Sequence, residues 1–270
     1  MMLTTLIVLL LSMATLTEVR DAFQQRLLTC LYRGPESSSL VLKGGAAMRV
    51  LTASARYTQD LGFDHDPHRS LTSLQKTVRA AVARAVQGSG LTQVSISEPK
   101  QTDTVARWKI AGRTSSGEDL HLTVEVSRRG APDLGHVVKI PVQIGDRTLP
   151  RVYVSVYDEQ ALTDNKLAAL LDERRTAPRD IYDLEVLLAR GTCPSPVAVE
   201  RAGGWEALME RAGKKLDLIG WPHFRDQVLP ALPPEIQAHV DEDEYLAMKV
   251  RLLDSLDKCL TAGPGGEARS

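Results

Sequence analysis

The sequence is short of cysteine, of net charge and of long apolar runs, and each shortage excludes a class of protein. Its three cysteines, Cys30, Cys193 and Cys259, are an odd number at wide spacing and lack the pattern of a metal site. We therefore predict reduced thiols in a cytoplasmic protein. A formal net charge of −1 over 270 residues argues against nucleic-acid binding through bulk attraction, although the acidic run 241–244 can mask a local basic face.

The longest apolar stretch, Leu3 to Leu16, imitates the apolar core of a secretory signal. No Lys or Arg precedes it, it is too short to span a bilayer, and it continues into an amphipathic pattern over 18–28. We predict one helical region over residues 3–32, packed on the core, and no membrane association. The alternative, a secreted or membrane-anchored binding protein, rests on this stretch only. No internal repeat, zinc spacing or Ser/His/Asp nucleophile arrangement is present in the sequence.

The remaining composition, 43% apolar and 25% charged, is typical of a globular protein with a sizeable core and one or two domains. Apolar residues at helical spacing predict a helix over 71–86, and four segments lean toward strand: 104–111, 120–127, 136–144 and 152–157. This order predicts an α+β fold. After a Gly/Pro break beyond Arg190, helical patterns cover parts of 205–216, 224–229 and 234–260. We predict a first domain over 1–190, a helical C-terminal region over 191–262 and a disordered tail over 263–270.

One segment of the sequence has the pattern of a phosphate-binding site. The apolar run Leu40 to Leu42 ends in Lys43-Gly44-Gly45, and a helical pattern follows. A strand that passes through two glycines into a helix exposes backbone N–H groups at a positive helix terminus, where anions bind. Taken alone, Gly-Gly after a strand is also an ordinary tight turn.

The next segment, Asp60-Leu61-Gly62-Phe63-Asp64, has an acidic face. The strand period of two places positions 60, 62 and 64 on one face and Leu61 and Phe63 on the other. Carboxylates beside a phosphate site can hold the divalent metal that phosphates carry. The alternative is an edge strand whose charges lie in water.

A third carboxylate, Glu125, lies in a strand pattern in which Leu122, Val124 and Val126 alternate with polar residues. It can face Asp60 across adjacent strands. A solvated glutamate in a half-buried strand explains the same pattern.

Farther along, Lys166 lies inside the helical pattern that begins after Asp158, where a lysine is usually a surface residue with its stem on apolar side chains. Thr176 to Asp180 has the composition of a helix start, with a Thr cap, an early Pro and an acidic first turn. In that position Asp180 can simply complement the helix dipole.

Four segments, residues 42–49, 56–64, 165–170 and 178–184, form one ordered pattern. In order and spacing they resemble the AbiEii/AbiGii-type nucleotidyltransferase toxins of bacterial abortive-infection and toxin–antitoxin systems. The resemblance covers residues 27 to 188, and four matches in order are more specific than any one alone.

The resemblance implies a mixed nucleotidyltransferase-like sheet and transfer of a nucleotide from a nucleoside triphosphate (NTP), with Mg²⁺, to an acceptor such as the 3′ end of tRNA. It also implies a cognate antitoxin as partner. The implied site residues are Asp60, Lys166 and Asp180 for catalysis, Lys43, Gly44, Gly45, Arg56, Thr58 and Lys166 for the nucleotide, and Asp60, Asp64 and Glu125 for metal. Asp180, with Arg179 and Asp183, is expected to pair with Lys166 or an arginine.

The sequence departs from the family pattern at one position. Family members usually carry Asp-x-Asp in the second segment, whereas this chain has Asp60 and Gly62. Asp64 lies on the same face, but a strand advances about 6.6 Å over two residues, so Asp64 cannot take the same place without rearrangement. Two hypotheses follow: a nucleotidyltransferase, and a catalytically degenerate protein of the same fold that binds nucleotide, RNA or antitoxin.

Overall fold

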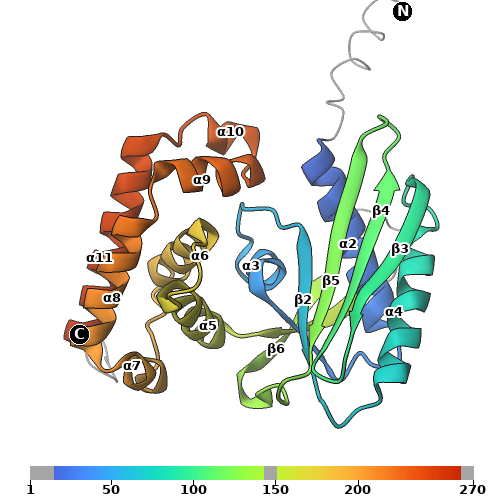
Figure 1. Cartoon of the computed structure of the whole chain (residues 1–270), viewed down its shortest axis with the longest axis horizontal. Coiled ribbons are helices and arrows are strands. Elements are labelled where there is room, and N and C mark those ends of the chain that lie inside the picture. The colour runs from blue at the N-terminus through green and yellow to red at the C-terminus, as the bar shows by residue number, and fades with distance from the viewer. Residues whose placement is uncertain (1–14, 143–150, 263–270) are drawn as a thin grey trace, which may run out of the picture.

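The computed structural model describes residues 15–142 and 151–262, and these residues contain one mixed seven-stranded sheet (Figure 1). The sheet has the strand order β3-β4-β5-β2-β1-β7-β6. Its strands are β1 (Leu40–Lys43), β2 (Asp60–His65), β3 (Thr92–Gln101), β4 (Val105–Arg113), β5 (Asp119–Ser127), β6 (Val137–Val142) and β7 (Val152–Tyr157). The α+β class and the mixed sheet predicted from the sequence are confirmed.

Strands β1 and β2 lie at the centre of the sheet. They pair antiparallel with each other, β1 pairs parallel with β7, and β2 pairs parallel with β5. In this register Lys43 lies opposite Gly62, and Gly62 lies opposite Glu125. The two motif-bearing strands are therefore direct neighbours, and their polar positions share one face.

Some helices pack on the sheet, and others form a second group beside it. The longer ones are α2 (Leu16–Tyr32), α3 (Gly44–Thr52), α4 (Leu71–Val86), α5 (Glu159–Leu171), α6 (Pro178–Ala189), α8 (Trp205–Leu218) and α11 (Glu242–Ala262). Shorter ones are α7 (Pro196–Ala202), α9 (Trp221–Gln227), α10 (Pro234–Gln237), and the 3₁₀ turns η1 (Leu134–His136) and η2 (Leu229–Ala231). Figure 1 shows α5 to α11 gathered on one side of the sheet.

The described residues pack into two hydrophobic cores. One core joins the apolar face of the sheet, including Leu61 and Phe63, to α2, α3 and α4. The other joins α5 and α6 to the C-terminal helices and includes Leu167 and Leu184. Leu162 of α5 and Leu187 of α6 belong to the first core, so the two cores meet within α5 and α6, whereas the sequence places a domain boundary at residue 190.

Several elements differ from the sequence predictions. Helix α2 begins at Leu16, where a capping box between Thr15 and Glu18 starts it, so the helix predicted over 3–32 does not continue through residue 15. The predicted C-terminal helix over 234–260 is divided into α10 and α11, and strand β3 and helix α7 were not predicted. The apolar residues 3–14, part of the strand predicted over 136–144, and the tail 263–270 lie outside the described residues. Within the described ranges, no helix is long and apolar enough to cross a membrane.

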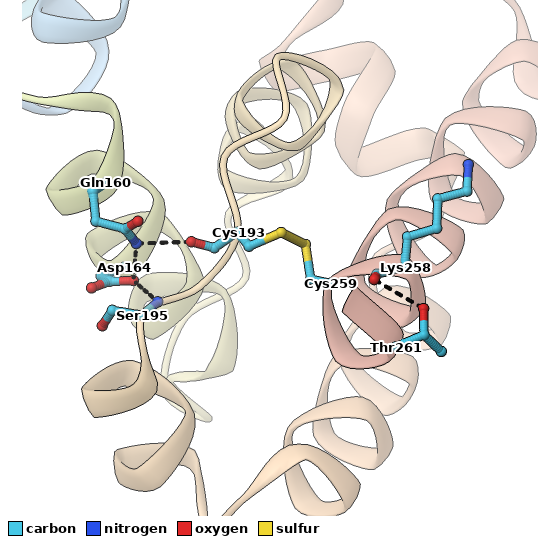
Figure 2. Close-up of a disulfide and its surroundings, with 7 residues drawn as sticks. All are labelled: Gln160, Asp164, Cys193, Ser195, Lys258, Cys259 and Thr261. Atoms are coloured by element: carbon cyan, nitrogen blue, oxygen red, sulfur yellow. Dashed lines mark hydrogen bonds between the residues drawn. A yellow bond between two sulfur atoms is a disulfide. The ribbon is translucent and has the colours of Figure 1, made fainter. Parts of the chain in front are cut away.

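The prediction of three reduced thiols is wrong for two of them. Cys193 and Cys259, 66 positions apart, form a disulfide that joins the segment before α7 to the end of α11 (Figure 2). Cys30 is free and buried. Hydrogen bonds hold the Cys193 segment against α5: Gln160 Nε2 donates to the Cys193 carbonyl at 2.8 Å, and the Ser195 N–H donates to Asp164 at 2.9 Å. Sequence spacing gave no sign of this pair, because tertiary packing brings the two segments together.

Candidate active site

A polar cleft of about 340 Å³ lies where the centre of the sheet meets α5 and α6. It is lined by residues of β1, β2, α3 and the α5–α6 segment. They are Lys43, Gly44, Gly45, Arg56, Thr58, Asp60, Gly62, Asp64, Leu162, Asn165, Lys166, Ala169, Arg175, Arg179 and Asp180. Every residue predicted for nucleotide binding or catalysis is in this set. Of the predicted metal ligands, Asp60 and Asp64 line the cleft and Glu125 does not.

The N-terminus of α3 opens into the cleft. Lys43 is the N-cap residue, and its side chain makes no capping hydrogen bond to the first N–H groups of the helix. Gly44 has a φ of 69°, which favours glycine, and open space lies beside it. Gly45 is tightly enclosed: a Cβ there would lie 2.9 Å from Arg56 Nη2 and 3.1 Å from Thr58 Oγ1. The positive φ at Gly44 and the close approach of Arg56 and Thr58 at Gly45 therefore both favour glycine at this terminus, which has the character of an anion-binding site.

Asp60 begins β2 at the mouth of the cleft. Its side chain is exposed, and within the described chain its carboxylate makes no hydrogen bond or ion pair. Burial lowers the pKa of Arg20 on α2, and the nearby negative charge of Asp60 partly offsets this effect. Asp60 is thus the acidic group in the cleft that is free to meet a ligand.

Asp64, in contrast, is already engaged. Its Oδ1 accepts from Lys43 Nζ at 2.5 Å, and its Oδ2 accepts from the Tyr157 hydroxyl at 2.9 Å. Burial and the Asp64 carboxylate raise the pKa of Tyr157, so the phenol stays protonated and donates. Both carboxylate oxygens of Asp64 thus already accept a hydrogen bond, which leaves them less available to a metal ion than those of Asp60.

The predicted position of Glu125, facing Asp60 across adjacent strands, differs from the register, and its role as a metal ligand stays a prediction. The residue opposite Asp60 on β5 is Thr123, and Glu125 lies opposite Gly62. Glu125 is also the cross-strand partner of Arg107 on β4, whose Nε donates to its carboxylate at 2.8 Å. The Glu125 carboxylate is thus paired with a guanidinium on the sheet surface, and Glu125 is not among the residues that line the cleft.

Beneath the cleft, a buried ionic network joins the segment before β2 to α5 and α6. Arg56 binds Asp183 through two hydrogen bonds, of 2.9 Å from Nε and 2.7 Å from Nη2. Lys166 Nζ lies 2.6 Å from Asp183 and 3.0 Å from Asp180, and the expected pairing of the closing acidic motif with Lys166 is therefore present. Burial raises the pKa of Asp183, but the charges of Lys166 and Arg56 outweigh it, so the net pKa is below the ordinary value.

Two further cations line the cleft. Arg175, in the segment between α5 and α6, donates to Asp180 Oδ2 at 3.1 Å, and Arg179 is exposed. Helix α6 begins at Pro178 after Ala177, not after a Thr176 cap. The sequence analysis did not assign Asn165 or Arg175 to the site. The available signals were that Asn165 directly precedes Lys166 and that Arg175 is the second residue of the pair Arg174-Arg175.

The donor set fits one divalent ion and not a protein-bound pair. The described residues contain no group of three or more His, Cys, Asp or Glu side chains that could hold a metal. Mg²⁺ bound with a triphosphate typically needs only one or two carboxylates besides the phosphates and water, and Asp60 is available for this. Gly62 supplies no oxygen from a side chain, and Asp64 is paired with Lys43.

Comparison with known proteins agrees with this geometry. The model of the family described as "Nucleotidyl transferase AbiEii toxin, Type IV TA system" matches residues 26–262. This chain belongs to that family. It is thus a member of a family of nucleotidyltransferase toxins that act in toxin–antitoxin systems, and such enzymes generally use an NTP and a divalent metal.

Solved structures show the same fold at low sequence identity. JHP933 from Helicobacter pylori is 23% identical, with a TM-score of 0.61 over 93% of this chain and 96% of that one. MenT4, a nucleotidyltransferase toxin from Mycobacterium tuberculosis H37Rv, is 18% identical, with a TM-score of 0.52 over 94% of this chain and 87% of that one. A search of curated proteins found no match.

Proposed function

We propose that the cleft binds an NTP with Mg²⁺ and that the protein transfers a nucleotide from it to an RNA acceptor, the 3′ end of a tRNA. The observation that carries this proposal is the convergence of an uncapped helix terminus, a free carboxylate and five cationic side chains in one cleft. The free carboxylate is Asp60, and the cations are Lys43, Arg56, Lys166, Arg175 and Arg179. Because its substrates are cytoplasmic, we place the protein in the cytoplasm, with an antitoxin as its protein partner.

In this proposal the chain contributes positioning and charge neutralisation, which dominate phosphoryl-transfer chemistry. The α3 N-terminus receives the triphosphate at Gly44 and Gly45. Lys166 has three N–H donors, of which two are directed at Asp180 and Asp183, so one remains for a phosphate oxygen. Mg²⁺, when bound, neutralises phosphate charge, and Asp60 is the residue that would hold it.

The test is transfer of label from each α-labelled NTP to total tRNA. We expect measurable labelling by the wild-type protein and at least a tenfold loss in Asp60→Asn, since loss of about 1.4 kcal/mol of transition-state stabilisation costs a factor of ten. Asp254→Asn, the same change at an exposed position on α11, should transfer like wild type. Labelling by Asp60→Asn at the wild-type rate would contradict the proposal.

A second function is supported by Gly62, which removes one carboxylate of the family pattern. The alternative is a catalytically degenerate protein that binds nucleotide, RNA or antitoxin without transfer. A Cβ at position 62 would lie 3.6 Å from Lys43 Cγ and 3.7 Å from the Lys43 carbonyl oxygen, both ordinary contacts, so Gly62→Asp can be accommodated. Labelling by Gly62→Asp but not by wild type would favour the degenerate protein.

A further inference from the structure

Lys43 takes an unusual path across the cleft. It lies directly opposite Gly62 in the β1–β2 register, and its Cγ lies 3.6 Å from the point where a Cβ of residue 62 would be. Because Gly62 has no side chain, the Lys43 stem lies beside this position and its ammonium reaches Asp64, two residues farther along β2. The lysine thus occupies the side of the site from which the family carboxylate is missing.

The ammonium is also accessible and held in place. About a third of the Lys43 side chain is exposed and it lines the cleft next to Gly44, where the α3 terminus opens. The Lys43 ammonium donates one of its three N–H groups to Asp64, and Asp64 is itself fixed by the Tyr157 hydroxyl. Two donors therefore remain for a ligand in the cleft.

We infer that the Lys43 ammonium is a fixed cation for the triphosphate, in place of a second divalent metal ion. This inference rests on the proposed function, since it requires a triphosphate in the cleft. A paired, oriented ammonium supplies a positive charge and hydrogen bonds to phosphate oxygens without a metal-binding carboxylate at position 62. The site accordingly holds one metal ion per bound triphosphate, at Asp60.

The experiment measures the affinity for inorganic triphosphate, which needs no assumption about the base. Calorimetric titrations are made with Mg²⁺ and with EDTA, on wild type, Lys43→Met, Lys43→Arg and Lys76→Met. Lys76 is an exposed lysine on α4 and gives the same loss of charge far from the site. Circular dichroism melts identify any variant that fails to fold.

We expect wild type to lose less than tenfold in affinity when Mg²⁺ is removed. Lys43→Met should bind at least tenfold more weakly than wild type in EDTA, Lys43→Arg should recover most of the affinity, and Lys76→Met should equal wild type. If wild type binds but Lys43→Met binds equally well in EDTA, the inference fails and the proposed function stands. If wild type binds triphosphate under neither condition, both fail.

A second readout counts metal ions directly. Electron paramagnetic resonance with Mn²⁺ should give one ion per bound triphosphate in wild type. In Gly62→Asp, the new carboxylate lies across from Lys43 and should raise this number to two and make binding in EDTA more than tenfold weaker than with Mg²⁺. Two Mn²⁺ ions per triphosphate in wild type would overturn the inference.

Discussion

At the scale of single residues, Gly45 shows how one position sets the geometry of the site. The residue opens α3 with no Cβ, and Arg56 and Thr58 approach its backbone more closely than a side chain allows. Arg56 cannot easily move away, because Asp183 holds its guanidinium with two hydrogen bonds. The glycine is therefore required by both the phosphate-binding terminus and the buried network below it.

We expect Gly45→Ala to lower the free energy of unfolding by about 1–3 kcal/mol, since the added methyl overpacks this contact. Gly213→Ala is the matched control, because Gly213 lies inside α8 with nothing within 4 Å of an added Cβ. Gly213→Ala should raise the free energy of unfolding by about 0.5–1 kcal/mol, because alanine has the higher helix propensity. Urea unfolding measures both, and equal effects of the two variants would contradict the described contact.

The sequence predicted much at this scale. The period of two in Asp60 to Asp64 correctly placed the polar and apolar faces of β2, because one face of the strand is buried and the pattern is strict. The partners of these groups were not predictable, since Lys43–Asp64 and Glu125–Arg107 depend on the register between strands. Register is a property of the assembled sheet, and no local pattern in the sequence contains it.

At the scale of secondary-structure elements, the ionic network ties the sheet to the helical region. Asp183 on α6 is fully buried and meets Arg56 before β2 and Lys166 on α5. The Tyr57 N–H also donates to the Ala231 carbonyl at 2.7 Å, so the segment before β2 contacts η2 as well. These bonds fix α5 and α6 against the sheet, and with them the cations that line the cleft.

We expect Asp183→Asn to lower the free energy of unfolding by about 3–5 kcal/mol, because it leaves two buried cations without their shared counter-charge. Asp254→Asn, an exposed change on α11, should stay within about 0.5 kcal/mol of wild type. Chemical denaturation measures the difference. If Asp183→Asn lowered the free energy of unfolding by less than about 1 kcal/mol, the described contacts of Asp183 with Arg56 and Lys166 would be contradicted.

A second buried contact, at the end of β2, predicts a pH dependence. His65 is buried, burial lowers its pKa below 6.5, and its bond of 3.2 Å to Glu36 offsets this only in part. Since the folded state disfavours the proton, this group contributes stability fully above pH 6.5 and loses it as the pH falls below that value.

We expect the free energy of unfolding of wild type to fall more than that of His65→Gln between pH 7.5 and 5.5, because the folded state of wild type disfavours protonation of His65. Urea unfolding at the two pH values gives this difference directly, because the other titrating groups contribute to both proteins. Parallel pH profiles would mean that His65 titrates alike in the folded and unfolded chain.

At the scale of the whole molecule, two cores meet along α5 and α6. The sequence identified the C-terminal helices, but not that α5 and α6 belong to their core, because an apolar helix face does not reveal its partner. Strand β3 was missed for a related reason: it is an edge strand with mostly exposed side chains and two register shifts against β4, so it lacks the alternation of a half-buried strand. The Cys193–Cys259 disulfide likewise arises from packing within the helical core.

We expect the disulfide to stabilise the oxidised protein by up to about 4 kcal/mol, the chain-entropy value for a loop of its 66-residue separation. Dithiothreitol should therefore lower the melting temperature of wild type. It should have no effect on Cys193→Ser or Cys259→Ser, which already lack the bond while keeping Cys30. An equal response of wild type and the serine variants to reductant would contradict the bond.

The central claim is that the cleft at the N-terminus of α3 holds a nucleoside triphosphate, and calorimetric titration of the four NTPs tests it most directly. We predict that wild type binds at least one NTP, more tightly with Mg²⁺ than without. Gly45→Ala should bind at least tenfold more weakly and Gly213→Ala like wild type, because only the former narrows the phosphate-binding terminus. No binding of any NTP at millimolar concentration, or equal affinities of Gly45→Ala and wild type, would contradict the claim.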